Sequence, residues 1–113
     1  KQSNRKSVNN IYIPLNNGHQ RLPKKDIYYI EASGSYVTIY TTKNNIVVST
    51  NLGNIQKQLQ CLHFIRISRK HIVNINHIDR IENNCIIINE SALMIGDAYK
   101  NDLLEQIQII KTK

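Results

Sequence analysis

Hydrophobic and polar residues alternate along much of this 113-residue chain. Apolar positions recur with a period of two in residues 11–15, residues 27–32 and 36–41 are expected to form the two strands of a further hairpin, and clusters of asparagine, serine and glycine separate these stretches. This pattern is typical of β-strands joined by tight turns. We expect a hairpin turn at Asn16-Asn17-Gly18 and another at Ser33-Gly34-Ser35. Further strands are predicted at residues 20–22, 46–50, 64–67, 72–74, 78–82, 85–89 and 92–95.

The apolar spacing changes to three and four residues in two places, which predicts two short helices. The face of the first is formed by Leu52, Ile55, Leu59 and Leu62, with Thr50 or Asn51 as N-cap. The face of the second is formed by Tyr99, Leu103, Ile107 and Ile110, with Asp97 as N-cap.

The layout is therefore mostly β, with eight to ten short strands and two short helices. Residues 1–10 lack an apolar period and are expected to be a flexible leader or the end of a linker, and residues 11–113 are expected to form one domain. The predicted core consists of Ile27, Ile30, Val37, Ile39, Leu59, Phe64, Ile72, Val73, Ile81, Ile86, Ile88 and Leu104.

The charge balance bears on the partner. Fifteen Lys and Arg residues against eight Asp and Glu residues give a net charge of +7. A basic domain of this size is typical of nucleic-acid binding, although solvated lysines that maintain solubility are the simpler interpretation. No apolar run exceeds four residues, so the sequence predicts no membrane-spanning helix.

Catalytic and metal-binding patterns are missing from the sequence. It has no Gly-rich phosphate loop and no GxSxG motif, and its acidic residues are scattered singly. Cys61 and Cys85 are too few for a disulfide scaffold and are expected to be buried or idle thiols in a reducing compartment. Cys61 and His63 lie too close together and too isolated for a zinc site. We therefore predict a non-enzyme without a cofactor or metal.

The densest basic stretch is Arg66-Ile67-Ser68-Arg69-Lys70-His71, between two apolar groups of β type. Arg66, Ser68 and Lys70 share one face of a straight strand, and Arg69 lies where the strand is expected to give way to a loop. An arginine fork can read guanine, and a lysine can act as a point charge on phosphate. A charged edge strand that resists aggregation explains the same residues, and composition alone does not separate the two hypotheses.

Residues 64–74, Phe-Ile-Arg-Ile-Ser-Arg-Lys-His-Ile-Val-Asn, resemble the signature F-x-R-x-H-R-S-x-x-V-N of the LytTR DNA-binding domain. Three other segments agree in order and spacing. Asp-Ile-Tyr-Tyr-Ile-Glu-Ala at 26–32, followed by Tyr36-Val37, is similar to the family's D-I-x-Y-I-E-A and Y-V strands. Residues 52–59 match its short helix, and Ile95-Gly96-Asp97 resembles the element before its last helix. The resemblance extends over residues 11–107.

This resemblance implies an elongated fold of several small antiparallel sheets, with one short internal helix and a C-terminal helix. It further implies a cytoplasmic effector domain of a bacterial two-component response regulator, with a receiver domain upstream. Such domains bind promoter DNA at direct repeats, often as a pair of subunits. Loops, rather than a recognition helix, read successive major grooves.

The same resemblance suggests three DNA-binding regions. The first is the hairpin with Ser35 and Tyr36, the second is the loop at residues 68–70, and the third is the start of the final helix. The residues expected to contact DNA are Ser35, Tyr36, Arg66, Ser68, Arg69, Lys70, Tyr99 and Lys100. Arg69 is the strongest candidate for a base contact, and Arg66 could equally hold the strand through an ion pair or a phosphate. We expect Asn74 to make a turn or a buried backbone bond, and Glu31 to pair with a basic or amide neighbour.

Three positions depart from the family pattern. Ser68 replaces the usual His, Lys70 replaces the usual Ser, and Asp97 replaces the usual Ser or Thr. Lys70 adds attraction to phosphate, whereas the negative charge of Asp97 opposes an anion contact at the last helix. The operator sequence therefore cannot be copied from relatives.

Two other functions fit part of the pattern. A protein-interaction module could use exposed β edges, and its basic face would then be incidental. A single-strand or RNA binder is less favoured, because the tyrosines fall mostly within strands and the chain lacks tryptophan for stacking.

Overall fold

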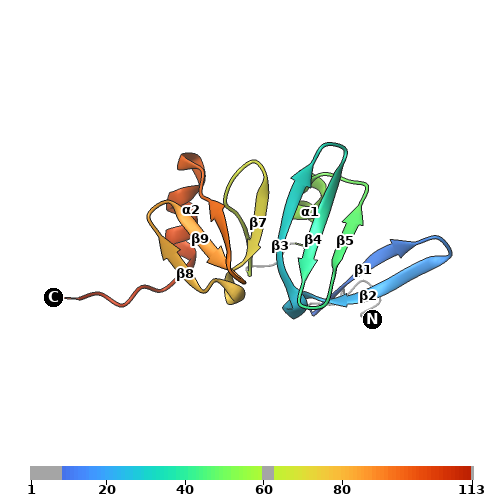
Figure 1. Ribbon diagram of the computed structural model, residues 1–113, viewed down its shortest axis with the longest axis horizontal. Helices are drawn as coiled ribbons and strands as arrows, with labels where there is room; N and C mark the ends of the chain where they lie inside the picture. The colour runs from blue at the N-terminus through green and yellow to red at the C-terminus, as the bar shows by residue number, and fades with distance from the viewer. Residues whose placement is uncertain (1–8, 60–62, 113) are drawn as a thin grey trace, which may run out of the picture.

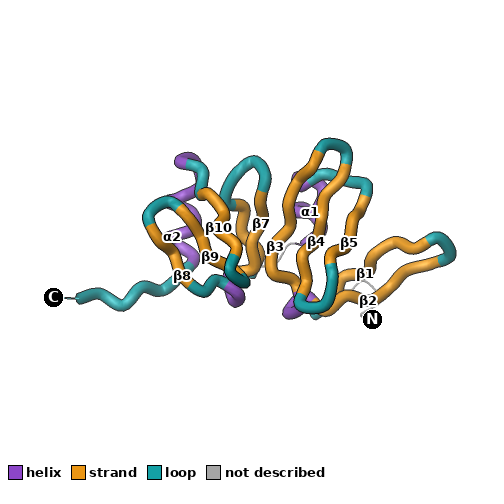
Figure 2. The backbone as a smooth tube through the Cα atoms, viewed as in Figure 1, coloured by secondary structure: helices purple, strands orange, loops and turns teal. Residues whose placement is uncertain are grey.

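The computed structural model describes residues 9–59 and 63–112. These residues form an elongated body with principal extents of 55 × 38 × 26 Å, built from three small antiparallel sheets in a row (Figures 1 and 2). The predicted mostly-β, elongated fold with an internal and a C-terminal helix is confirmed. Residues 1–8 of the predicted leader, together with Cys61 and Leu62, lie outside the described residues.

The central sheet has five strands in the order β5-β4-β3-β7-β6. Strands β3 and β4 form the predicted hairpin, and β7 pairs with the other edge of β3, where Glu31 lies opposite His71. The strands are β3 (Ile27–Ser33), β4 (Tyr36–Thr41), β5 (Asn45–Val48), β6 (Phe64–Arg66) and β7 (His71–Asn74).

A smaller sheet lies on each side of the central one (Figure 1). The N-terminal hairpin pairs β1 with β2, and Asn10 already belongs to β1, one residue before the predicted strand start. The other sheet has the order β10-β9-β8. These strands are β1 (Asn10–Leu15), β2 (Gly18–Pro23), β8 (Arg80–Glu82), β9 (Cys85–Ile88) and β10 (Ser91–Met94).

Both predicted helices form. Helix α1 (Leu52–Leu59) is capped by Asn51, whose Oδ1 accepts the backbone N–H of Asn54 at 2.9 Å, as predicted. Helix α2 (Lys100–Gln106) follows the short 3₁₀ helix η3 (Asp97–Tyr99). Two other 3₁₀ turns connect strands. The first, η1 (Lys24–Asp26), joins β2 to β3, and the second, η2 (Ile75–His77), joins β7 to β8.

The central sheet separates two hydrophobic cores, because adjacent residues of a strand point to opposite faces. Ile30 and Ile72 face the core that α1 and the N-terminal hairpin cover. Tyr29 and Val73 face the core shared with the β8–β10 sheet and α2. A register irregularity between Ile27 and Tyr29 puts Ile27 on the same side as Ile30.

The C-terminal helix differs from the prediction in three ways. Asp97 does not cap it, because the chain first makes η3, whose N-cap is Gly96, and α2 then begins after Tyr99 without a side-chain cap. The helix ends at Gln106, so Ile110 lies beyond it and is 84% exposed. Leu103 is the residue buried by α2, whereas Leu104, predicted as core, is 38% exposed.

Candidate nucleic-acid interface

The three predicted DNA-binding segments lie along one long edge of the molecule, the upper edge in Figure 1. They are the β3–β4 turn, the loop between β6 and β7, and the start of α2 with η3. Backbone hydrogen bonds join them. The N–H of Ala32 donates to the carbonyl of Lys70 at 2.8 Å, and the N–H of Gly96 donates to that of Ile67 at 2.7 Å. We call this surface the loop edge.

The β6–β7 loop, residues 67–70, is held at every carbonyl. Besides the bonds from Gly96 and Ala32, the carbonyls of Ser68 and Arg69 accept hydrogen bonds from the guanidinium of Arg66, at 2.8 Å to Nε and 3.0 Å to Nη2. The loop is therefore ordered before any ligand binds, which reduces the entropy that binding would have to remove.

Arg66 therefore uses its guanidinium N–H groups mainly for hydrogen bonds within the protein. Its remaining Nη1 donates to Oε1 of Gln56 on α1 at 3.3 Å, and the residue is partly buried. Of the two roles that the sequence left open, the observed contacts match the structural one. They are made with loop carbonyls, however, and not through an ion pair.

Ser68 closes the same loop from inside. Its Oγ accepts the backbone N–H of Lys70 and that of His71, both at 3.1 Å. This is the local turn that serine side chains commonly form. Its hydroxyl oxygen is therefore already occupied by two donors.

Arg69 and Lys70 have the opposite character. Both residues are exposed, and within the described residues neither side chain has a hydrogen bond or an ion pair. A bonded backbone thus presents two adjacent, exposed cationic side chains. The loop has the geometry of a presented arginine fork next to a point charge.

The β3–β4 turn forms the second part of the loop edge. Ser33 pairs with Tyr36, so Gly34 and Ser35 make a two-residue turn, and Gly34 adopts a φ of +60° that disfavours other residues. Ser35 is exposed, and Tyr36 is 50% exposed. Both can offer hydroxyl groups to a ligand along this edge.

The start of α2 forms the third part. Lys100 is exposed, and its Nζ donates to Oδ1 of Asn84 in the β8–β9 turn at 3.2 Å. Tyr99 is partly buried and packs close to Gly96, where an added Cβ would lie 3.1 Å from the tyrosine ring. Asp97 is exposed and puts one negative charge on this segment.

A polar cluster lies directly behind the loop edge. Glu31 accepts the hydroxyl of Tyr40 at 3.0 Å and faces Nε2 of His71 at 3.1 Å. Burial lowers the pKa of His71 below its ordinary value, against the opposing pull of Glu31. Burial and the bond to Glu31 raise the pKa of the Tyr40 hydroxyl. The prediction that Glu31 pairs with a basic neighbour is confirmed.

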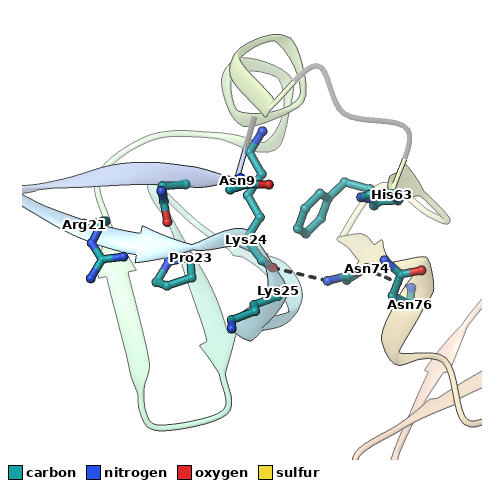
Figure 3. A pocket seen from close by; sticks show the side chains of 10 residues that line it. Asn9, Arg21, Pro23, Lys24, Lys25, His63, Asn74 and Asn76 are labelled. Carbon is teal, nitrogen blue, oxygen red and sulfur yellow. Dashed lines mark hydrogen bonds between the residues drawn. The ribbon is translucent and has the colours of Figure 1, made fainter. Parts of the chain in front are cut away.

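A second basic group, Arg21, Lys24 and Lys25, lies beyond the far end of β3 from the loop edge, beside a pocket (Figure 3). The seven residues of β3 separate the two edges by about 20 Å. The three charged ends in Figure 3 spread apart and do not converge on one point. They therefore do not form a cradle for an anion.

Asn74 holds this opposite edge together. It is 2% exposed, and its Nδ2 donates to the carbonyls of Ile27 at 3.0 Å and Lys24 at 3.4 Å. Its Oδ1 accepts the N–H of Asn76 at 3.0 Å. Both alternatives predicted for this residue, a turn and a buried backbone bond, are therefore observed together.

Other kinds of site are not found in the part of the chain that the structure describes. In residues 9–59 and 63–112, no three His, Cys, Asp or Glu side chains are placed to hold a metal ion. Across the same residues, no helix is both long and apolar enough to cross a membrane. Cys85 is a free cysteine.

Sequence reasoning missed two residues of this region, because no local pattern assigns a role to His71 or Asn84. Glu31 and His71 are 40 positions apart, and only the pairing of β3 with β7 makes them neighbours. The contact of Asn84 with Lys100 likewise depends on how the β8–β10 sheet packs against η3 and α2.

Comparison with known proteins agrees with this architecture. A transcriptional regulatory protein YpdB of Escherichia coli K12 is 36% identical over 69 residues, which cover 58% of this chain and 28% of YpdB. The sensory transduction protein LytT of Bacillus cereus is 25% identical over 108 residues, covering 90% of this chain and 44% of LytT. The chain thus spans less than half the length of these relatives.

A solved structure gives the fold, and a family sequence model gives the family. The LytTr DNA-binding domain of a methyl-accepting/DNA response regulator from Bacillus cereus superposes with a TM-score of 0.73, over 87% of this chain and 95% of that one. At 18% identity, this likeness shows the fold. The model described as "LytTr DNA-binding domain" matches residues 18–108. The chain therefore belongs to the LytTR DNA-binding domain family.

Proposed function

We propose that the loop edge binds double-stranded promoter DNA, and that the chain is the effector domain of a bacterial transcriptional regulator. The observation that carries this proposal is the arrangement of the three segments, which come from distant parts of the sequence and lie on one edge, joined by backbone bonds. The relatives named as transcriptional regulatory or sensory transduction proteins support it.

The dimensions of the domain are compatible with contacts in successive major grooves. Its longest extent is 55 Å, and one turn of B-DNA spans about 34 Å. A duplex lying along the loop edge would meet the β3–β4 turn, the β6–β7 loop and the start of α2 in that order. The opposite edge, where the short helix η1 lies, would face away from this duplex.

The proposed contacts divide by chemistry. Arg69 reads a base with its two-pronged guanidinium, and Lys70 and Lys100 contact phosphates. Ser35, Tyr36 and Tyr99 contribute hydroxyl groups. Arg66 and Ser68 act from behind, because their polar atoms are bonded to the loop that presents Arg69 and Lys70.

Membership of the family supports a proposal for the setting of the domain. We propose a cytoplasmic, non-enzymatic regulator of the two-component response-regulator type, with a receiver domain upstream of residue 1. Two subunits would bind direct repeats. Phosphorylation of the receiver would then raise the local concentration of paired domains at tandem sites.

Selection of bound sites from a random duplex pool, followed by footprinting, tests this function. The expected result is a short repeated motif, protected with a spacing of about one helical turn. Recovery of unrelated sequences with no protected repeat would contradict sequence-specific binding.

A salt titration separates DNA binding from the protein-interaction alternative. For DNA binding, the logarithm of affinity should fall linearly with the logarithm of salt concentration, with a slope of about −0.9 per phosphate contacted. An interaction module with an incidental basic face should bind random duplex DNA weakly, with no such linear dependence. Preference for single strands over duplex would favour the RNA-binder or single-strand alternative.

A further inference from the structure

The β6–β7 loop ends in a chain of polar side chains that crosses from one strand to the next. Tyr40 on β4 donates to Glu31 on β3, and Glu31 faces His71 on β7. Nδ1 of His71 lies 3.5 Å from Oγ of Ser68 in the loop. The histidine side chain is 12% exposed and that of Glu31 is 30% exposed, so water screens the cluster only partly.

The chemistry of the partners fixes the direction of each bond. A carboxylate only accepts, so Nε2 of His71 carries the proton that points to Glu31. In the neutral ring Nδ1 is then an acceptor. Ser68 Oγ already accepts two backbone N–H groups, and its own hydroxyl proton is left to point at Nδ1. In this state each bond has one donor and one acceptor.

A proton added at Nδ1 removes the match of one donor to one acceptor in these bonds. The ring nitrogen becomes a donor facing an oxygen whose two lone pairs already accept the N–H groups of Lys70 and His71. The serine hydroxyl must turn away, and three donors then compete for one oxygen. The strained residues are those that carry Arg69 and Lys70.

The charged groups around His71 do not raise its pKa above the ordinary value. Glu31 stabilises the protonated ring, whereas burial and the nearby charge of Lys70 oppose it. The ring of Tyr29 lies edge-on at 5.9 Å between centroids, and Tyr40 meets Glu31 from β4. The balance lowers the pKa of His71, so the neutral, ordered network is the form present near neutral pH.

We propose that His71 is a positioning residue for DNA recognition, and that its neutral form, held between Glu31 and Ser68, fixes the loop that presents Arg69 and Lys70. The proposal rests on the proposed function. It adds that sequence discrimination depends on pH through a residue that does not itself touch DNA. The effect concerns discrimination, because an added positive charge near the loop strengthens attraction to any duplex.

The test compares the selected duplex with a scrambled duplex of the same length and composition, from about pH 8 to about pH 5, where histidine titrates. The ratio of the two affinities cancels the general attraction to phosphate. The wild-type ratio should fall about fivefold to tenfold, the size expected when one hydrogen bond is lost. The imidazole proton signals of His71, followed by NMR, should change over the same range.

Two variants and a matched control complete the experiment. H71Q keeps a donor and an acceptor but does not titrate, so its ratio should stay near the wild-type high-pH value throughout. S68A removes the hydroxyl that faces Nδ1 of His71 and should show the low ratio at every pH. H77Q is the control, because that imidazole bonds the carbonyl of Lys25 at the opposite edge, and it should retain the wild-type pH dependence.

The outcomes distinguish the two proposals. A wild-type domain that does not prefer the selected duplex at about pH 8 would contradict the proposed function. Discrimination that is present but independent of pH would overturn only the role of His71. That role would also be overturned if H71Q titrates like wild type, or if S68A discriminates normally.

Discussion

Two basic regions lie at opposite edges of the same central sheet and differ in how their charged groups are arranged. At the loop edge, the carbonyls of residues 67–70 are all bonded, and the cationic side chains of Arg69 and Lys70 project from this fixed frame. At the opposite edge, Arg21, Lys24 and Lys25 spread apart around a pocket that the buried Asn74 also lines (Figure 3). Charge and a hydrogen-bonded backbone are present at both edges, because the carbonyls of Lys24, Lys25 and Asp26 also accept hydrogen bonds. The loop edge differs in that three chain segments, joined by backbone bonds, line up along it.

This comparison teaches that net charge is a poor guide to the interface. A charge of +7 indicates a polyanionic partner without saying which face meets it. The arrangement of the charged groups gives more of that information, because an arginine fork on a bonded loop, beside two other segments on the same edge, can be held in register with a base edge.

Removing equal charge from the two edges should give the largest difference. The double variant R69A/K70A should weaken binding to the selected duplex by about 2–4 kcal/mol, since it removes a base contact and a phosphate contact. The double variant K24A/K25A removes the same charge and should change affinity by less than about 1 kcal/mol. Equal losses, measured by fluorescence anisotropy at fixed salt, would mean that charge alone drives binding.

The loop edge can be tested further at Arg69 alone. R69A should lose about 1–3 kcal/mol of discrimination between the selected and the mismatched duplex. R69K should lose nearly as much, because it keeps the charge but not the planar fork. Competition binding with single-base variants measures this loss. If R69K discriminates as well as wild type, Arg69 contacts only phosphate.

The opposite edge should respond in stability. N74A removes an amide that bonds two backbone carbonyls and caps the turn at Asn76, and it should lower the free energy of unfolding by about 1–3 kcal/mol. N76A is the control, because only the backbone N–H of Asn76 takes part, and its effect should be within about 0.5 kcal/mol. Urea unfolding gives both values. Similar destabilisation by both variants would contradict this assignment.

Much of the fold was predictable because its signals are local. Alternating apolar residues and asparagine-rich turns located the hairpins, and the spacing of Leu52, Ile55 and Leu59 located α1. The end of the chain was less predictable. The turn at Asp97–Tyr99 starts as a 3₁₀ helix, and α2 then stops at Gln106, so the predicted face through Ile110 does not form.

The candidate site was predictable at the level of segments, and less so at the level of roles. The motif around Arg69 located the central loop. It could not show that Arg66 bonds that loop's carbonyls, or that His71 meets Glu31, because both depend on how strands distant in sequence pair. Roles that depend on non-local strand pairing have no local signal in the chain.

The smallest expected effect is the pH dependence of stability from His71. Burial lowers its pKa in the folded protein below the ordinary value of 6.5, so the unfolded chain takes up a proton first. The stability that the neutral His71 contributes to the folded protein is therefore fully present above pH 6.5 and is lost as the pH falls through the lowered pKa. Thermal unfolding at a series of pH values should show a smaller acid loss in H71Q than in wild type. An equal loss in both would assign the effect to other groups.

The most direct test of the loop edge as the DNA-binding surface is an NMR titration of the ¹⁵N-labelled domain with the selected duplex. The largest shifts in backbone amide signals should fall at residues 34–36, 68–71 and 97–100, with little change at residues 21–25. Shifts concentrated around Arg21, Lys24 and Lys25, with the loop edge unchanged, would contradict the account.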